Sequence, residues 1–299
     1  PRVPAVTGSW LRTDAGMVRA PWRVVAFGTA VAASSFVFLG VALPMATATP
    51  LAGWARAARI PLDQVATVAC LVAATWLTGR LVHGERDPVW PHAGLTRGAW
   101  RPRVLAAAFA AGTLVILLPA LALVAVGAAR FEPATATDGP LTVAWAALAL
   151  LIPAAAAEEL LFRGYAFDAC RAGMGPRGAV AVTSVGFALA HLLNPDPTIA
   201  SVAAVACAGV FLAIVRLTTG SLVAAVLAHL GVNYAQAVGL HAAVSGLALQ
   251  TPAYRYVPTG PDWLTGGAWG PEAGAGVVVA LAVASFRYAT SRQTAEARR

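Results

Sequence analysis

Residues 141–163 read LTVAWAALALLIPAAAAEELLFR, a long apolar run that ends with Glu158, Glu159 and Arg163. A helix needs about 20 apolar residues to cross the hydrocarbon core of a bilayer, so this run is long enough. A charged side chain at the centre of such a helix costs at least about 2.5 kcal/mol. The stretch therefore predicts a transmembrane helix whose two glutamates are retained for a function.

The rest of the chain has the same character. Of its 299 residues, 59% are hydrophobic and 11% are charged, and the mean hydropathy is +0.70. Because soluble domains carry about 25% charged residues, this composition excludes soluble, disordered and coiled-coil proteins. We expect one all-α, polytopic transmembrane domain over residues 1–299. It contains about eight transmembrane helices, near 24–43, 64–82, 103–127, 141–162, 179–194, 198–215, 221–241 and 275–288.

The net charge of +8 comes from arginine, since the chain has no lysine. With eight spans and the N-terminus inside, 17 of the 21 arginines fall on the cytoplasmic side, as the positive-inside rule requires. The sequence thus predicts a multi-pass protein of the cell membrane with cytoplasmic tails at 1–23 and 289–299. The basic charge then marks topology, and we expect no nucleic-acid partner. The arginine-rich, alanine-rich composition is typical of a bacterial protein.

The two glutamates at the end of the first run cannot share one role, because neighbouring residues point about 100° apart on a helix. Glu159 precedes Arg163 by four residues, the favourable order for an ion pair. Glu158 has Phe162 at that distance and stays free. A free carboxylate in apolar surroundings is a candidate general base. A double glutamate at a water-facing helix end is the alternative interpretation.

Two later runs also carry polar residues in apolar surroundings. Phe187 and His191 lie four residues apart, as do His229 and Asn233, so each pair projects from one helix face. A lone histidine is often only a satisfied core residue, and a His–Asn pair can simply join two helices by hydrogen bonds. Their depth in the membrane distinguishes these alternatives from a shared site.

We compare depths by counting about 1.5 Å per helical residue. If the helix continues past Arg163 and the membrane edge lies near Arg171, Glu158 lies about 20 Å inside. The same count from the cytoplasmic ends of the later helices gives about 21 Å for His191 and 18 Å for Asn233. Independent buried residues would have no reason to agree, so the three helices are predicted to form one site.

A carboxylate, two imidazoles and an amide contain no strong nucleophile, so the natural reaction is activation of water for hydrolysis. No HExxH motif is present. Residues 243–246 lack the leading glycine of a rhomboid-like GxSG, and no GxGD stretch exists. We expect no cofactor, although zinc on Glu158, His191 and His229 is an alternative.

Three motifs on three helices together resemble those of a known family, the CAAX protease and bacteriocin-processing (CPBP) group. This group is also called the abortive-infection family and includes the type II CAAX prenyl endopeptidases. The resemblance covers residues 141–241, which we expect to be the catalytic core region. The motifs are Glu-Glu-x-x-x-Arg (Glu158, Glu159, Arg163), Phe-x-x-x-His (Phe187, His191) and His-x-x-x-Asn (His229, Asn233).

The resemblance implies an α-helical intramembrane endopeptidase that acts on a membrane-embedded or lipidated protein or peptide in the lipid bilayer. In a bacterium a leader peptide or a membrane protein is the expected substrate. The resemblance also implies roles for seven side chains: water activation by Glu158 and His191, an oxyanion site at His229 and Asn233, and shaping of the site by Glu159, Arg163 and Phe187.

Two other functions stay open. Some members of the wider family are non-catalytic, so an immunity protein or membrane scaffold is one alternative. The complete set of motif residues argues against a retired enzyme. A transporter with a Glu/His/Asn site at the membrane midplane is the other, because such residues also mark ion paths. No inverted repeat or pair of broken helices supports it.

Overall fold

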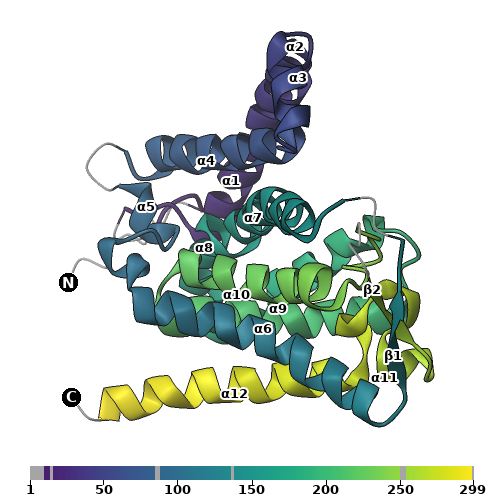
Figure 1. The fold of residues 1–299 in the computed structure, drawn as a ribbon. Coiled ribbons are helices and arrows are strands. Elements are labelled where there is room, and N and C mark those ends of the chain that lie inside the picture. The colour runs from purple at the N-terminus through teal and green to yellow at the C-terminus, as the bar shows by residue number, and fades with distance from the viewer. Residues whose placement is uncertain (1–9, 14–15, 85–87, 136–137, 250–253, 298–299) are drawn as a thin grey trace, which may run out of the picture.

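The computed structural model describes residues 10–13, 16–84, 88–135, 138–249 and 254–297. In this part of the chain, long helices lie side by side and a short β-ribbon closes one end (Figure 1). The long helices are α1 (Ala20–Ser35), α4 (Leu62–Val82), α6 (Pro102–Ala125), α7 (Pro140–Arg163), α8 (Tyr165–Ala190), α9 (Ile199–Thr219), α10 (Leu222–Tyr234) and α12 (Ala275–Ala297).

Shorter elements extend or connect these helices. The π-helical turns η1 (Phe36–Ala42) and η4 (Ala235–Leu240) continue α1 and α10. The remaining elements are α2 (Leu43–Thr47), α3 (Pro50–Ala57), α5 (Val89–His92), η2 (Arg97–Trp100), β1 (Ala129–Pro133), η3 (His191–Leu193), β2 (Tyr254–Pro258), α11 (Asp262–Thr265), η5 (Gly267–Trp269) and η6 (Pro271–Ala273).

The described residues contain six helical stretches that are long and apolar enough to cross a membrane. This confirms the prediction of an all-α, polytopic membrane protein. The first stretch, Ala20–Thr47, is longer than expected, and Pro140–Leu193 contains both α7 and α8. The last apolar helix, Ala275–Thr290, is shorter. Every one of the eight predicted runs overlaps a helix, while the number of crossings stays a prediction.

The prediction that the fourth helix continues past Arg163 is wrong. α7 ends there, and Gly164 adopts φ −78° and ψ −128°, outside the helical region. A side chain at this position would collide with the carbonyl oxygen of Leu160, which explains why the break falls on a glycine. α8 then begins at Tyr165 and changes direction at Gly175, where φ is +74°. These two breaks let α8 pack back along α7 and carry its C-terminal end towards Glu158.

α10 is the most buried of the membrane-length helices in the described part of the chain, and its start is encoded locally. Gly220 takes the left-handed conformation that ends α9, with φ +69°. Ser221 then caps α10, accepting a hydrogen bond from the amide of Ala224 at 3.0 Å. α10 lies so close to α6 that a side chain at Gly112 would collide with the carbonyl of Ala228.

Between the predicted runs 221–241 and 275–288 lie short elements that the hydropathy pattern does not predict. Residues 254–258 form β2, which pairs antiparallel with β1, and α11, η5 and η6 follow. Residues 250–253 lie outside the described part. The ribbon and α11 lie at the end of the helices opposite α5 and the C-terminal end of α12 (Figure 1). Short polar and aromatic strands give no hydropathy signal, which is why the pattern missed them.

Several arginines join helix ends opposite the ribbon. Arg23 in α1 donates to Asp168 of α8 at 3.0 Å, and Arg101 donates to the carbonyl of Thr219 at 3.2 Å. The predicted cytoplasmic tails 1–23 and 289–299 stay a prediction; α1 begins at Ala20 and α12 continues to Ala297. Parts of both tails lie outside the described residues, as do four arginines of the topology count, Arg2, Arg86, Arg298 and Arg299.

We predict that Gly112→Ala lowers the midpoint of thermal unfolding in detergent by at least about 3 °C, since the new methyl group meets the backbone of α10. The matched control is Gly28→Ala in α1, where nothing lies within 4 Å of the added carbon. In that helix alanine is favoured over glycine by about 0.5–1 kcal/mol. A midpoint for Gly112→Ala as high as that of the control would contradict the close packing of α6 and α10.

Candidate active site

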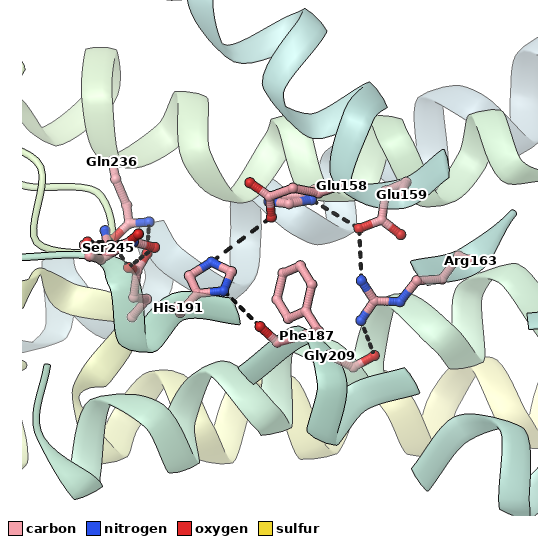
Figure 2. Close-up of polar contacts among 11 residues, drawn as sticks. Glu158, Glu159, Arg163, Phe187, His191, Gly209, Gln236 and Ser245 are labelled. Carbon is pink, nitrogen blue, oxygen red and sulfur yellow. Dashed lines mark hydrogen bonds and ion pairs between the residues drawn. The ribbon is translucent and has the colours of Figure 1, made fainter. Parts of the chain in front are cut away.

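Glu158, His191 and His229 meet inside the bundle, although they come from α7, the end of α8 and α10. Oε2 of Glu158 lies 3.9 Å from Nε2 of His191 and 3.9 Å from Nε2 of His229. Figure 2 shows His191 pointing towards Glu158 from the opposite side of the site. Separations of this length are too long for direct hydrogen bonds and are commonly bridged by a water molecule.

Oε2 of Glu158 itself is buried and has no hydrogen-bond partner among the described residues. A buried carboxylate oxygen without a partner costs free energy, so such atoms normally meet water or a ligand. The rest of the Glu158 side chain is 37% exposed, because it borders a cavity. Oε2, the atom that faces both imidazoles, is therefore the buried oxygen of this carboxylate that lacks a polar partner.

The neighbouring Glu159 is engaged differently. It forms the predicted ion pair with Arg163, with 3.1 Å between Nη1 and Oε1, and both side chains are fully buried. Arg163 also donates to the carbonyl oxygen of Gly209 at 2.9 Å, and its guanidinium lies 4.3 Å from the ring centre of Phe187. Oε1 of Glu159 accepts a further hydrogen bond from Nδ1 of His229 at 3.0 Å. The ion pair thus orients an imidazole of the site.

Hydrogen bonding also fixes the orientation of His191. Its Nδ1–H donates to the carbonyl oxygen of Phe187 at 2.8 Å, and a carbonyl can only accept. In the neutral ring the unprotonated Nε2 is then the nitrogen that faces Glu158. The ring of Phe187 packs against His191 at 4.6 Å and against His229 at 5.7 Å between centroids. Phe187 therefore contacts both imidazoles and holds one through its backbone.

A cavity of about 330 Å³ opens beside these groups. Its polar wall contains Glu158, His191, His229 and Asn233, so the predicted amide reaches the same space. Most of the remaining wall is apolar and comes from α7 and from residues 244–249. Gln64 in α4 also contributes, so one of the earlier helices borders the site. The arrangement offers a base, two imidazoles and an amide to an apolar guest.

Four polar residues near the cavity were not among the predicted site residues: Asn194, Gln236, Ser245 and Glu272. The amide of Asn194 donates to the carbonyl of Ser245 at 2.9 Å. The backbone N–H and the Oγ–H of Ser245 donate to Oε1 of Glu272 at 2.6 and 2.8 Å, and Gln236 donates to Oε2. Glu272 is the only charged residue between positions 263 and 286, and that isolation was the available signal.

In the described part of the chain, no group of three or more His, Cys, Asp and Glu side chains is arranged to hold a metal ion. The two imidazoles and Glu158 supply the donor types that zinc uses, and the hydrogen bond from Nδ1 of His229 to Glu159 leaves Nε2 of that ring facing Glu158. The expectation that the site works without a metal stays a prediction, which a chelator tests below.

A comparison with known protein families finds a match over the segment that contains this site. The sequence model of the family described as type II CAAX prenyl endopeptidase, Rce1-like, matches residues 140–235. This segment contains Glu158, His191, His229 and Asn233, and the match confirms the resemblance to the CAAX protease group. Residues 140–235 are therefore similar to an Rce1-like domain, which supports a CAAX-protease-like function in general. No curated protein and no solved structure matches the chain.

We predict that Glu159→Ala and Arg163→Ala each lower the free energy of unfolding by about 3–5 kcal/mol, since each leaves a fully buried charge without its partner. Glu158→Gln is the matched control. It neutralises the adjacent carboxylate, which makes no hydrogen bond at its buried oxygen, and is expected to keep wild-type stability. Thermal or denaturant unfolding of the purified protein measures all three. Equal losses in the control and the pair variants would contradict the structural role of the pair.

Proposed function

We propose that the chain is an intramembrane endopeptidase in which Glu158 and His191 activate a water molecule that attacks a peptide bond. The observation that carries this proposal is the position of Oε2 of Glu158, 3.9 Å from both Nε2 atoms and without a hydrogen bond of its own. A water molecule at this point can be oriented by an imidazole and deprotonated by the carboxylate. The similarity to an Rce1-like domain supports hydrolysis over the other uses of such a site.

In the proposed reaction, Nε2 of His191 accepts one hydrogen bond from the water while Glu158 takes its other proton. The resulting hydroxide adds to the carbonyl carbon of the substrate and forms a tetrahedral intermediate. Glu158 then returns its proton to the amine as the C–N bond breaks, which leaves one amine product and one carboxylic acid, and the acid releases its proton to water. Glu158 is the only one of the two glutamates suited to this exchange, because Glu159 already accepts from Arg163 and His229.

The negative charge on the carbonyl oxygen needs donors, and we assign these to His229 and Asn233. Both line the cavity that contains Glu158. Since Nδ1–H of His229 is given to Glu159, the protonated ring donates to the oxyanion from Nε2. Removing one such donor from a hydrolase typically lowers kcat about 10²- to 10³-fold. Glu159 and Arg163 act only through His229 and are positioning residues.

The expected substrate is a membrane-embedded or lipidated protein or peptide. The cavity wall is largely apolar, so it suits a chain delivered from the bilayer more than a charged soluble one. We infer that the protein crosses the cell membrane with the arginine-rich helix ends on the cytoplasmic side. Arg23 and Arg101, which join helix ends opposite the ribbon, support this orientation.

We predict that Glu158→Gln and His191→Ala each lower cleavage of a co-expressed membrane-anchored reporter at least 100-fold, because each removes a group that acts on the water. Glu132→Gln, which neutralises a carboxylate in the ribbon, is the matched control and is expected to retain wild-type cleavage. Quantitative immunoblotting of the reporter measures the rates. Undiminished cleavage by both variants would overturn the mechanism, and a cellular phenotype that survives Glu158→Gln would indicate a non-catalytic scaffold or immunity protein.

A chelator separates the metal-free mechanism from its zinc alternative. We predict that prolonged treatment of the purified protein with 1,10-phenanthroline or EDTA changes its cleavage rate less than about twofold. The reason is that the carboxylate and His191 alone can activate the water. Loss of activity that added zinc restores would contradict this and would assign Glu158, His191 and His229 as ligands.

A further inference from the structure

Glu272 binds three donors at one point behind the site. Its Oε1 accepts from both the backbone N–H and the hydroxyl of Ser245, and its Oε2 accepts from Nε2 of Gln236. Figure 2 shows Gln236 and Ser245 together on the side of His191 away from Arg163. Gln236 and Ser245, like Glu272, follow residue 235, so the group lies beyond the segment that the family model matches.

The free-energy cost of burying this carboxylate indicates that Glu272 has a specific role. Glu272 and Gln236 are 6% and 0% exposed, and a carboxylate taken out of water loses several kcal/mol of hydration unless donors compensate it. Burial raises the pKa of Glu272, while its hydrogen bonds with Gln236 and Ser245 oppose that shift by favouring the ionised form. Three apolar residues in place of Glu272, Gln236 and Ser245 would pack without this desolvation cost. The directional hydrogen bonds of the carboxylate therefore fix the relative positions of the segments that carry these residues.

The segment positioned by Glu272 is residues 241–249, which we call the roof because it lines the cavity next to Glu158. Val244, Ser245, Leu247 and Leu249 of the roof line the 330 Å³ cavity. Ser245 holds the roof to Glu272 and also accepts from Asn194 through its carbonyl. The roof is thus joined on one side to the buried carboxylate.

On the other side, Asn194 joins the roof to the catalytic histidine, which it follows by three residues at the end of η3. A second cavity of about 30 Å³ is lined by Glu272, Ser245, His191, His229 and Asn233 at one side and by apolar side chains over most of its wall. A space of this size is large enough for one water molecule. The carboxylate and the proposed catalytic groups therefore border one small, mainly apolar chamber.

We propose that Glu272 is a positioning residue of the active site, which holds the roof through Ser245 and thereby fixes the helix end that carries His191. This inference rests on the proposed function for its effect on catalysis, and its structural half stands independently. Glu272 touches no reacting atom in this scheme. It acts through Ser245, Asn194 and the chamber behind His191.

An exchange of the two partners tests the proposal. Gln236→Glu sets a second carboxylate against Oε2 of Glu272, where two like charges repel and a hydrogen bond is lost. The double variant Gln236→Glu/Glu272→Gln restores one carboxylate and one amide: the new glutamine keeps Oε1 for Ser245 and offers Nε2 to residue 236. Glu272→Gln alone is expected to be mild, because Oε1 of Gln236 has no partner in the described structure and the amide can turn to present it.

We expect Gln236→Glu to lower kcat for the membrane-anchored reporter at least tenfold while KM changes less than threefold, and the exchanged pair to recover kcat to within threefold. A roof residue outside the hydrogen-bonded group gives the contrast. Leu247→Ala removes part of the apolar cavity wall, which enlarges the cavity. It is therefore expected to change KM more than kcat. General misfolding caused by Gln236→Glu would lower the amount of active protein without a selective effect on kcat, and the exchanged pair would not recover kcat.

Cysteine labelling tests the roof without reference to cleavage. With Cys70, Cys170 and Cys207 replaced by alanine, Val244→Cys is buried and is expected to react with maleimide at least tenfold faster in Gln236→Glu than in the parent or the exchanged pair. Ala30→Cys, buried in α1, reports general unfolding and stays protected throughout. Wild-type rates of labelling and cleavage in Gln236→Glu, or no recovery in the exchanged pair, would overturn the proposal. Absence of cleavage by the wild-type protein would overturn only the proposed function, because the labelling rates still decide whether Glu272 holds the roof.

Discussion

The fully buried ion pair between Glu159 and Arg163 is the constraint on which the site depends. A bundle with few charges places one carboxylate and one guanidinium where neither has contact with water, which costs several kcal/mol unless neighbouring groups offset it. Part of that cost remains, because Oε2 of Glu159 and Nε of Arg163 have no hydrogen-bond partner among the described residues. The compensation comes from Gly209, from the ring of Phe187 and from His229. These contacts tie α7, α8, α9 and α10 together at one level. Glu158, which precedes Glu159 in the helix, takes no part in this pair and lines the cavity.

The two adjacent glutamates make different contacts because neighbouring residues of a helix point in different directions. The sequence predicted this difference. Spacing of four residues marked the partner of Glu159, and the absence of a cation at Phe162 marked Glu158 as free. The sequence also predicted the convergence of His191 and His229 on Glu158, but the depth it gave for Glu158 assumed a helix that continues past Arg163, and α7 ends there. Periodicity could not provide the path of the chain, because the break falls at Gly164, where any side chain would collide with the backbone of Leu160.

Residues outside the three motifs were harder to predict for a physical reason. The role of Glu272 depends on hydrogen bonds to Ser245 and Gln236, which lie 27 and 36 residues away and follow no helical spacing. The ribbon of β1 and β2 likewise depends on pairing across more than a hundred residues. Composition marks such positions only as isolated polar residues in apolar surroundings. In this chain the motif spacing pointed to the partner of Glu159, whereas the buried network of Glu272 emerged only from its contacts in the structure.

The central claim is that Glu158 and His191 act on one water molecule, and a double-mutant cycle of cleavage rates tests it most directly. If both groups serve one step, removing the second after the first costs little more. The account predicts that Glu158→Gln/His191→Ala cleaves the reporter within about threefold of the slower single variant. Losses that multiply, so that the double variant shows the product of the two single effects, would contradict a shared water and would place the two residues in separate steps.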